Sequence, residues 1–512
     1  MNDLTQADMD RAAEAEARPR RAADPAQRDF DMIIIGAGMS GIGAAHNLLT
    51  RRPNESFAIL EAKADYGGTW RTHTYPGIRS DSDFYTFGFG FKPWLGDPIA
   101  KADQILDYLS EAIEEDDLTG HIHYQRRVKK ASWSTAEQRW TLQVENGATG
   151  EVEKYTTRFM WMCQGYYDHD NPYTPDWDGM GDFKGQIVHP QQWPDDLDYK
   201  GKRVVVIGSG ATAATLIPSL APDVGHVTML QRSPTYFHPG FNKNELADQL
   251  RALEIPDAWT HEIVRRAYLK EQREIQELSI AYPEEAKKEM INVVKEHLGE
   301  DFDVETHFTP SYNPWRQRIA FVPDGDLFEA MKTGKASVVT DHIDRFVENG
   351  ILLKSGKVLE ADIIITATGF NLSFFGGIPF DMDGEPIDFA DTVTYRGLMI
   401  EGVPNLSYIF GYLRTAWTMR VDLCCDFYCR LLDRMDERQA KVVVAQMTDE
   451  ERALPRDRII PESEFNSGYM QRGLHKFPKR VEQEPWNAPL DYYVERETIP
   501  SIDLDEPALK YS

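Results

Sequence analysis

The fold of this chain is decided by residues 30–49, which read FDMIIIGAGMSGIGAAHNLL. A short apolar run predicts a buried strand of a parallel sheet, a G-x-G-x-x-G turn follows it at once, and the residues after the turn continue as a helix. The next apolar run, residues 56–60, is followed by Glu61. Together these segments predict a strand–helix–strand unit of the Rossmann type at the start of an α/β protein.

The same pattern returns in residues 203–220, which read RVVVIGSGATAATLIPSL. Here the third glycine of the turn is replaced by Ala213, a change that the pattern tolerates. The strand expected over residues 227–230 is followed by Arg232, and no acidic residue closes it. Two glycine turns, each between a strand and a helix, therefore predict an α/β fold with two Rossmann-type dinucleotide-binding domains.

Glycines and composition shifts indicate the domain boundaries. Apolar runs at residues 159–163 and 363–367 predict strands that close the two units, and they are followed by Gly165 and Gly369. Residues 241–305 are charged, have a helical period and are interrupted by prolines, so we expect three helices inserted in the second domain. The predicted organisation is a disordered tail over 1–28, a first domain over 29–167 and 369–512 that ends in a surface wrap, and a second domain over 168–368.

Composition excludes several classes of protein. The 512 residues carry 56 Lys and Arg against 83 Asp and Glu, a formal charge of −27, so we do not expect nucleic-acid binding. No run of about 18 apolar residues predicts a membrane span, and no export signal is recognisable. Only four cysteines occur, which favours a reducing cytoplasm over a disulfide framework. Peripheral membrane contact through a local apolar patch stays open, and so does the oligomeric state.

The first glycine turn has the parts of a dinucleotide site. Gly36 permits the tight turn, Gly38 lets the backbone approach a pyrophosphate, and Gly41 lets the helix pack closely on the strand. The anion then lies at the helix N-terminus, where unpaired N–H groups and the helix dipole favour it. Glu61 follows Gly41 by 20 residues, the distance at which a carboxylate accepts a hydrogen bond from a ribose hydroxyl.

The second turn, with Gly208, Gly210 and Thr212, differs in the residue that follows its second strand. Arg232 is placed where the first domain has Glu61. A carboxylate would repel a 2′-phosphate, whereas a guanidinium can pair with it at two points, so NADPH is favoured over NADH. The plainer alternative is that Arg232 is a solvated surface charge. Two such sites imply two cofactors, and the usual pair is FAD with NADPH.

The cysteines do not support a disulfide reductase. Such an enzyme needs a redox-active pair beside the flavin, whereas Cys163 stands alone in the sequence. The other three are Cys424, Cys425 and Cys429. On a helix they would be scattered around its axis, and no histidine accompanies them, so we expect core packing and no metal site.

Two longer patterns resemble the fingerprints of the type I Baeyer–Villiger monooxygenases, within the flavin-containing monooxygenase superfamily. The first is GTW-x4-YPG-x3-D over residues 68–81, and the second is F-x-G-x3-H-x3-WP over residues 183–194. General flavin-containing monooxygenases carry Tyr where this chain has Trp193. The resemblance covers residues from about 30 to 490. The chain is most similar to the ethionamide-activating subfamily, through YPGIRSDSDFYTFGF (75–89), HPQQWPDDLDY (189–199) and YNPWRQR (312–318).

The resemblance implies roles for individual residues. Asp81 matches the active-site aspartate, Arg318 matches the catalytic arginine, and Trp70 belongs to the cofactor site. Arg316 remains an alternative to Arg318, because many family members carry Lys-Arg where this chain has Gln317-Arg318. The second fingerprint comprises Phe183, Gly185, His189 and Trp193. Its histidine is expected to couple nucleotide binding to the arrangement of the domains.

The implied enzyme uses FAD and NADPH to insert one oxygen atom of O2 into ketones, giving esters or lactones, and also oxidises thioethers. Attack on a ketone needs an anionic oxygen nucleophile, which an arginine that keeps its charge can stabilise. Trp417, Phe237 and Trp315 are candidates for an apolar substrate pocket, although each could equally be a core residue. The alternatives are a flavin monooxygenase that oxygenates nitrogen or sulfur without needing an arginine, and a non-catalytic flavoprotein.

Overall fold

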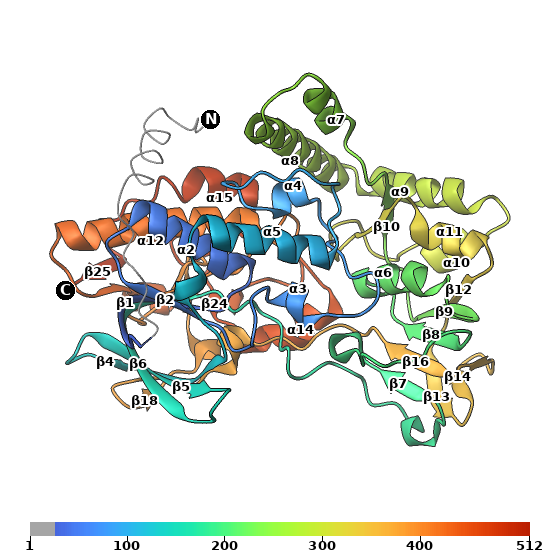
Figure 1. The fold of residues 1–512 in the computed structure, drawn as a ribbon, viewed down its shortest axis with the longest axis horizontal. Coiled ribbons are helices and arrows are strands. Elements are labelled where there is room, and N and C mark those ends of the chain that lie inside the picture. Colours follow the sequence, from blue (N-terminus) through green and yellow to red (C-terminus); the bar gives the residue numbers. More distant parts are fainter. Residues whose placement is uncertain (1–25) are drawn as a thin grey trace.

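The computed structural model describes residues 26–512 as two lobes placed side by side (Figure 1). One lobe is built on a sheet that contains β1 (Asp29–Ile35), and the other on a sheet that contains β8 (Arg203–Ile207). Each of these strands runs into one of the glycine turns, so the predicted α/β fold with two Rossmann-type domains is confirmed. Residues 1–25 of the predicted tail lie outside the described residues, and Arg28 forms an ion pair with Glu153.

The centre of the first lobe is a parallel core. β1 lies between β2 (Phe57–Leu60) and β6 (Val152–Met162), parallel to both. Alternate residues of β1 enter different hydrophobic clusters, Met32 on one face of the sheet and Ile33 on the other. Because both faces are covered, the strand is apolar at almost every position, which explains the continuous apolar run in its sequence.

Helices cover one face of this sheet. α2 (Met39–Arg51), α5 (Ala102–Glu115) and α12 (Thr418–Glu437) bury their apolar sides in a common cluster. The four cysteines are free thiols buried in the same cluster: Cys163, Cys424, Cys425 and Cys429. Burial raises the pKa of each thiol. The cysteines are therefore core residues, as expected, and remain protonated.

The first sheet also contains strands that the sequence patterns do not predict. β4 (Arg126–Ser134) pairs antiparallel with β5 (Arg139–Asn146), and β5 pairs antiparallel with β6. The apolar run at residues 159–163 predicts only the C-terminal end of β6. After the second lobe the chain returns to this sheet, because β17 (Phe380–Met382) pairs with β4 and β21 (Leu406–Tyr408) pairs with β6. Segments far apart in the sequence therefore build one sheet.

The second lobe has five parallel strands in the order β12-β9-β8-β16-β7. Beside β8 they are β7 (Gln186–Val188), β9 (His226–Gln231), β12 (Ala336–Thr340) and β16 (Ile363–Thr366). The strands predicted over 203–207, 227–230 and 363–367 are confirmed to within one residue at each end. The glycine turn follows β8 and leads into α6 (Ala211–Leu220), as the Rossmann pattern requires.

The predicted helical insertion is confirmed as three successive helices. They are α7 (Glu245–Ala252), α8 (Asp257–Ala281) and α9 (Pro283–Leu298). Pro256 is the residue before α8, and Pro283 is the first residue of α9. Proline is favoured at the first helical position, as at Pro283, because the first turn leaves its N–H groups unpaired in any case. The prolines that interrupt the sequence pattern therefore mark helix starts.

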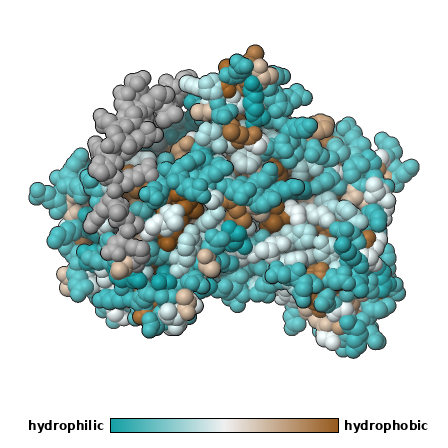
Figure 2. All heavy atoms as spheres, viewed as in Figure 1, coloured by the Kyte–Doolittle hydropathy of each residue, from teal (hydrophilic) through white to brown (hydrophobic). Residues whose placement is uncertain are grey.

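The apolar residues that recur with a helical period at the start of α8 do not lie on its buried side. Trp259 and Ile263 have exposed fractions of 57% and 37%, whereas Val264 and Arg265 are buried. The Arg265 guanidinium donates to backbone oxygens of the first lobe, including that of Tyr85 at 2.8 Å. Apolar surface therefore remains around the insertion, near the top of the view in Figure 2. In residues 26–512, no helix has both the length and the apolar character that crossing a membrane requires.

Residues 75–81 carry the chain from the first lobe onto the second and back. Tyr75 is buried in the core of the second lobe, and Arg79 pairs with Asp326 at 2.5 and 3.2 Å. Gly77 has a φ of +75°, and a Cβ at this position would lie 1.8 Å from Oγ of Ser219 in α6. This close approach brings Asp81, at the end of the segment, to the space between the lobes.

Candidate active site

A cavity of about 660 Å³ lies between the lobes and is lined by both glycine turns. The predicted site residues that line it are Gly36, Gly38, Glu61, Trp70, Asp81, Gly208, Gly210, Thr212, Arg232 and Arg318. Those outside the lining are Gly41, Phe183, Gly185, His189 and Trp193. Apart from Gly41, the structure thus brings together the residues assigned to cofactors and chemistry, and separates them from the second fingerprint.

The glycines of the first turn are needed for different reasons. Gly36 has a φ of +100°, and a Cβ added there would lie 3.0 Å from the backbone oxygen of Cys163. A Cβ on Gly41 would lie 1.9 Å from the oxygen of Gly36. Around Gly38, by contrast, the nearest protein atom would be 3.6 Å away, at Gly68. The fold itself tolerates a side chain at Gly38, so the open space there fits a ligand that approaches the backbone.

Glu61 is fixed at the cavity wall by two backbone groups. Its Oε2 accepts from the N–H of Ala37 and its Oε1 from the N–H of Lys63, both at 2.8 Å. Burial raises the pKa of Glu61, and these hydrogen bonds oppose that effect. Each carboxylate oxygen keeps a second lone pair. The side chain is therefore held in place and can still accept a hydrogen bond from a ligand hydroxyl.

In the second turn, too, one glycine is required by the fold and another is open to a ligand. Gly208 has a φ of +132°, and a Cβ there would lie 2.3 Å from the backbone oxygen of Ala367, so the fold requires glycine. A Cβ on Gly210 would meet no atom within 4 Å. The N-terminal turn of α6, with Thr212, borders the cavity beside this open position. Arg232 also lines the cavity, at the C-terminal end of β9.

Asp81 and Arg318 form a two-point ion pair in the cavity wall. Nε of Arg318 donates to Oδ2 of Asp81 and Nη2 donates to Oδ1, each at 3.0 Å. The partners are 237 residues apart in the sequence. The charge of Asp81 is the first cause that raises the pKa of Arg318, so the guanidinium keeps its charge throughout the physiological pH range. Its third nitrogen, Nη1, lies outside this two-point contact.

Arg316 occupies a different environment. It is exposed and is not among the residues that line the cavity. Its backbone oxygen accepts from the N–H of Asn466 at 2.8 Å, which ties the segment to the C-terminal part of the chain. The geometry therefore favours Arg318 over Arg316 as the arginine of this site, and the catalytic role of Arg318 stays a prediction.

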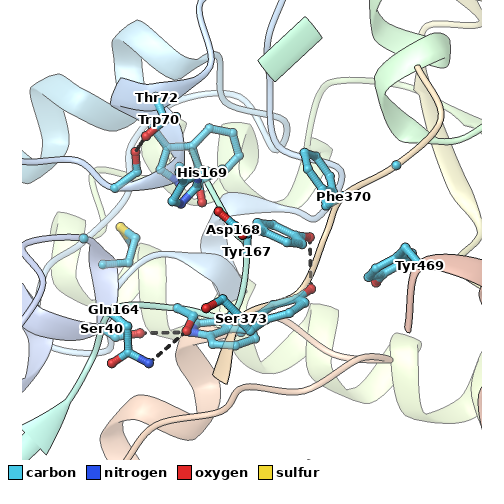
Figure 3. Close-up of a pocket in the computed structure, with 18 of the residues that line it drawn as sticks. Ser40, Trp70, Thr72, Gln164, Tyr167, Asp168, His169, Phe370, Ser373 and Tyr469 are labelled. Atoms are coloured by element: carbon cyan, nitrogen blue, oxygen red, sulfur yellow. Dashed lines mark hydrogen bonds between the residues drawn. The ribbon is translucent and has the colours of Figure 1, made fainter. Parts of the chain in front are cut away.

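Three tyrosines near this pair have no counterpart among the predicted residues. Tyr166 and Tyr167 follow β6, and the Tyr166 hydroxyl donates to that of Tyr167 at 3.0 Å. Tyr469, from α14 (Gly468–Gly473), faces Tyr167 across the pocket in Figure 3. The hydroxyl of Tyr166 and the guanidinium of Arg318 are close enough to the Tyr469 hydroxyl to act on its pKa. Burial raises the pKa of all three phenols, so they stay protonated hydrogen-bond donors.

The aromatic candidates divide into lining and core residues. Trp70 and Trp417 line the cavity. Nε1 of Trp417 donates to Oγ of Ser40, in the first glycine turn, at 2.9 Å. Phe237 is 2% exposed in the core of the second lobe, and Trp315 does not line the cavity. Of the three substrate-pocket candidates, Trp417 alone is therefore positioned to contact a ligand there.

The second fingerprint has a structural basis in the second lobe. Phe183 and Trp193 pack against two of its hydrophobic clusters. A Cβ on Gly185 would lie 2.2 Å from a backbone oxygen. Nδ1 of His189 accepts from a backbone N–H two residues further along, at 3.1 Å. These residues fix the chain where it enters the second lobe and do not face the cavity.

The fold and the cavity together define a class of protein. Two glycine turns, each with one position open to a ligand, lie at the carboxyl ends of parallel strands and face one space. This is the arrangement of an oxidoreductase that binds a flavin dinucleotide and a nicotinamide dinucleotide close together. The open positions, the helix N-termini and the polar groups at Glu61 and Arg232 fit both cofactors.

Comparisons with known proteins identify the family. Residues 34–101 match the model of the NAD(P)-binding Rossmann-like domain, and residues 95–239 match that of the flavin-binding monooxygenase-like family. The FAD-containing monooxygenase EthA of Mycolicibacterium smegmatis is 44% identical over 94% of this chain and 97% of its own length. The probable FAD-binding monooxygenase AlmA of Acinetobacter baylyi is 40% identical, over 95% and 96%. The chain therefore belongs to the FAD-containing monooxygenases.

Solved structures share this fold. A steroid monooxygenase bound to NADP superposes with a TM-score of 0.75 at 23% identity, covering 94% of this chain and 99% of that one. An open form of cyclohexanone monooxygenase gives a TM-score of 0.72 at 20% identity, covering 95% and 100%. The predicted class, a flavin-dependent monooxygenase with two dinucleotide-binding domains, is thus confirmed.

Proposed function

We propose that this protein is an FAD- and NADPH-dependent Baeyer–Villiger monooxygenase that converts ketones to esters or lactones and also oxidises thioethers. The observation that carries the proposal is the two-point pair of Arg318 with Asp81 in a cavity shared by both glycine turns. The names of its relatives support the monooxygenase class, and those of the solved structures with this fold include steroid and cyclohexanone monooxygenases.

The cofactors divide between the lobes in this proposal. The first domain, residues 29–167 and 369–512, holds FAD at the open position of Gly38. The second domain, residues 168–368, holds NADPH at the open position of Gly210. The two cradles line the same cavity, so the nicotinamide and the flavin can meet there.

Arg318 contributes electrostatic stabilisation. Bound and reduced FAD supplies the electrons that activate O2. The guanidinium stabilises negative charge on the attacking oxygen and on the former carbonyl oxygen of the substrate. Asp81 holds the guanidinium at two points, so the charge is already oriented before the reaction begins. Such preorganised donors act strongly because they need not reorient as charge develops.

The aromatic residues complete the site. Trp70 and Trp417 supply apolar surface for a small hydrophobic ketone or thioether and reduce the access of water. The hydroxyl of Tyr469 is protonated because burial raises its pKa, so it can donate a hydrogen bond to an oxygen atom of a ligand in the cavity.

His189 has a proposed role in coupling the lobes. Burial lowers the pKa of this imidazole, and the backbone of Tyr173 and of Gly369 opposes that effect. These two residues lie on the two connections between the lobes. The neutral ring therefore lies near both connections, which supports a part in setting the arrangement of the lobes. We also propose a cytoplasmic location, where four free thiols are stable.

Products formed under ¹⁸O2 test the proposed reaction. The FAD-loaded enzyme is supplied with NADPH and equal amounts of a methyl ketone and a thioether, and products are read by mass spectrometry. We expect an ester that contains one ¹⁸O atom, with sulfoxide as a lesser product. Sulfoxide without ester would instead establish the electrophilic alternative. Failure of NADPH to bleach the flavin anaerobically would establish a non-catalytic flavoprotein.

A further inference from the structure

A second arginine lines the cavity that both glycine turns share, and it comes from the C-terminal part of the chain. Arg472 lies on α14 and lines the same cavity as Arg232. Its guanidinium carbon is 3.5 Å from the centre of the Tyr173 ring, a cation–π contact that fixes the side chain. Among residues 26–512, neither arginine forms an ion pair with a carboxylate.

This absence of counter-charge matters because both guanidinium groups line one cavity. Carboxylates outnumber basic residues by 83 to 56, and arginines such as Arg79, Arg203 and Arg434 are paired. Partial burial, and after it the charge of Arg232, lower the pKa of Arg472, while Tyr173 opposes them. Two like charges that line one cavity repel, and an anion bound between them removes that cost.

We propose that Arg472 and Arg232 together clamp the 2′-phosphate of NADPH, so that the C-terminal segment supplies a specificity-determining residue for the nucleotide. The inference rests on the proposed placement of NADPH in the second lobe. A phosphate accepts hydrogen bonds from a guanidinium at two points, and two such groups can bind it from different sides. NADH has a hydroxyl at this position and gains nothing from the second charge.

The clamp makes the position of α14, which lies beside Arg318 in the cavity wall, depend on whether NADPH or NADH is bound. The short helix that carries Arg472 also carries Tyr469, which faces Tyr167 (Figure 3). The charge of Arg318 acts on both phenols. A 2′-phosphate held by Arg472 therefore ties α14 to the second lobe, and Tyr469 is held with it. NADPH therefore orders α14, whereas NADH, which lacks the 2′-phosphate, does not change it.

Binding measurements on the FAD-loaded enzyme separate the 2′-phosphate from the rest of the nucleotide. Adenosine 2′,5′-bisphosphate and 5′-AMP are titrated calorimetrically, with no substrate and no turnover. We expect Arg472→Ala to weaken the bisphosphate about tenfold or more and to leave 5′-AMP unchanged. Arg472→Lys, which keeps the charge but loses the planar fork, should recover part of the loss.

Arg456→Ala is the control, because Arg456 is an exposed arginine of the same segment that donates to the backbone of Asp391. It should leave both affinities unchanged. Equal losses for the two ligands in Arg472→Ala would overturn the clamp, and so would no loss for either. Because no reaction is measured, these outcomes do not depend on whether the enzyme makes an ester, and the ¹⁸O2 experiment judges that claim separately.

Hydrogen exchange tests the link to α14. We expect NADP⁺ to slow amide exchange in the peptide covering residues 467–473, NAD⁺ to leave it unchanged, and Arg472→Ala to remove the effect of NADP⁺. Equal protection by NAD⁺ and NADP⁺ would overturn the link, because the protection would then come from the part that the two nucleotides share. Both measurements together decide whether the 2′-phosphate reaches the C-terminal segment.

Discussion

The two glycine turns have the same backbone design and opposite charges at their ends. In each turn the first glycine is required by a positive φ and a nearby backbone oxygen, whereas Gly38 and Gly210 face open space. In the first unit the second strand is followed by Glu61, and in the second unit by Arg232. The backbone thus provides a general cradle for a pyrophosphate, and one side chain at the strand end selects the nucleotide.

The largest effect is expected from blocking the first cradle. Gly38 has an extended backbone that other residues adopt, so Gly38→Val should fold but exclude FAD. We expect colourless protein with an unchanged circular dichroism spectrum. Gly41→Val is the contrasting variant, because its Cβ would lie 1.9 Å from a backbone oxygen and the fold itself should fail. A yellow, FAD-loaded Gly38→Val protein would show that FAD does not approach this position.

A smaller effect is expected at the end of the second unit. Arg232→Ala should weaken NADPH roughly ten- to hundredfold, because charge-assisted hydrogen bonds contribute about 1.5–3 kcal/mol, and should change NADH little. The Michaelis constants for both nucleotides measure this directly. Arg203→Ala, which removes an arginine paired with Asp362 in the same lobe, should change neither. Equal loss for both nucleotides would mean that Arg232 serves their shared part or the fold.

The smallest effect concerns the segment that joins the two units. Gly77→Ala forces a non-glycine residue to a φ of +75° and places its Cβ against Ser219, so we expect a loss of about 1–3 kcal/mol and a lower melting temperature. Gly201→Ala is the matched control, because it has a φ of +67° with no atom near the added Cβ. Equal destabilisation in the two variants would show that backbone strain, and not the contact between lobes, requires Gly77.

The sequence predicts those parts of the fold whose signal is local. A strand, a glycine turn and a helix follow one another within residues 30–49, so the pattern can be read without tertiary knowledge. The hairpin of β4 and β5 leaves a weaker signal, although buried and less buried residues alternate along β5. Which face of α8 is buried depends on carbonyl groups of the other lobe, which accept from Arg265.

For the site as well, the sequence predicts the residues whose signal is local and misses those that only the tertiary fold brings together. Gly38 and Glu61 could be assigned from spacing, but Asp81 and Arg318 are 237 residues apart, and only the resemblance to a family suggested that they belong together. Tyr469 and Arg472 had no signal at all, because the path of the C-terminal segment over the cavity decides their position. Tyr166 could have been noticed, since it closely follows a predicted parallel strand, at the edge where such sheets bind ligands.

The role of Arg318 is tested most directly by its alanine variant, with Arg316→Ala as the matched control from the same segment. Arg318→Ala should keep its FAD and continue to oxidise NADPH, but ester formation should fall by at least about 10²–10³-fold, with hydrogen peroxide as the product. Arg316→Ala should form ester at the normal rate. Loss of ester formation in Arg316→Ala but not in Arg318→Ala would contradict the account, and so would normal ester formation in both.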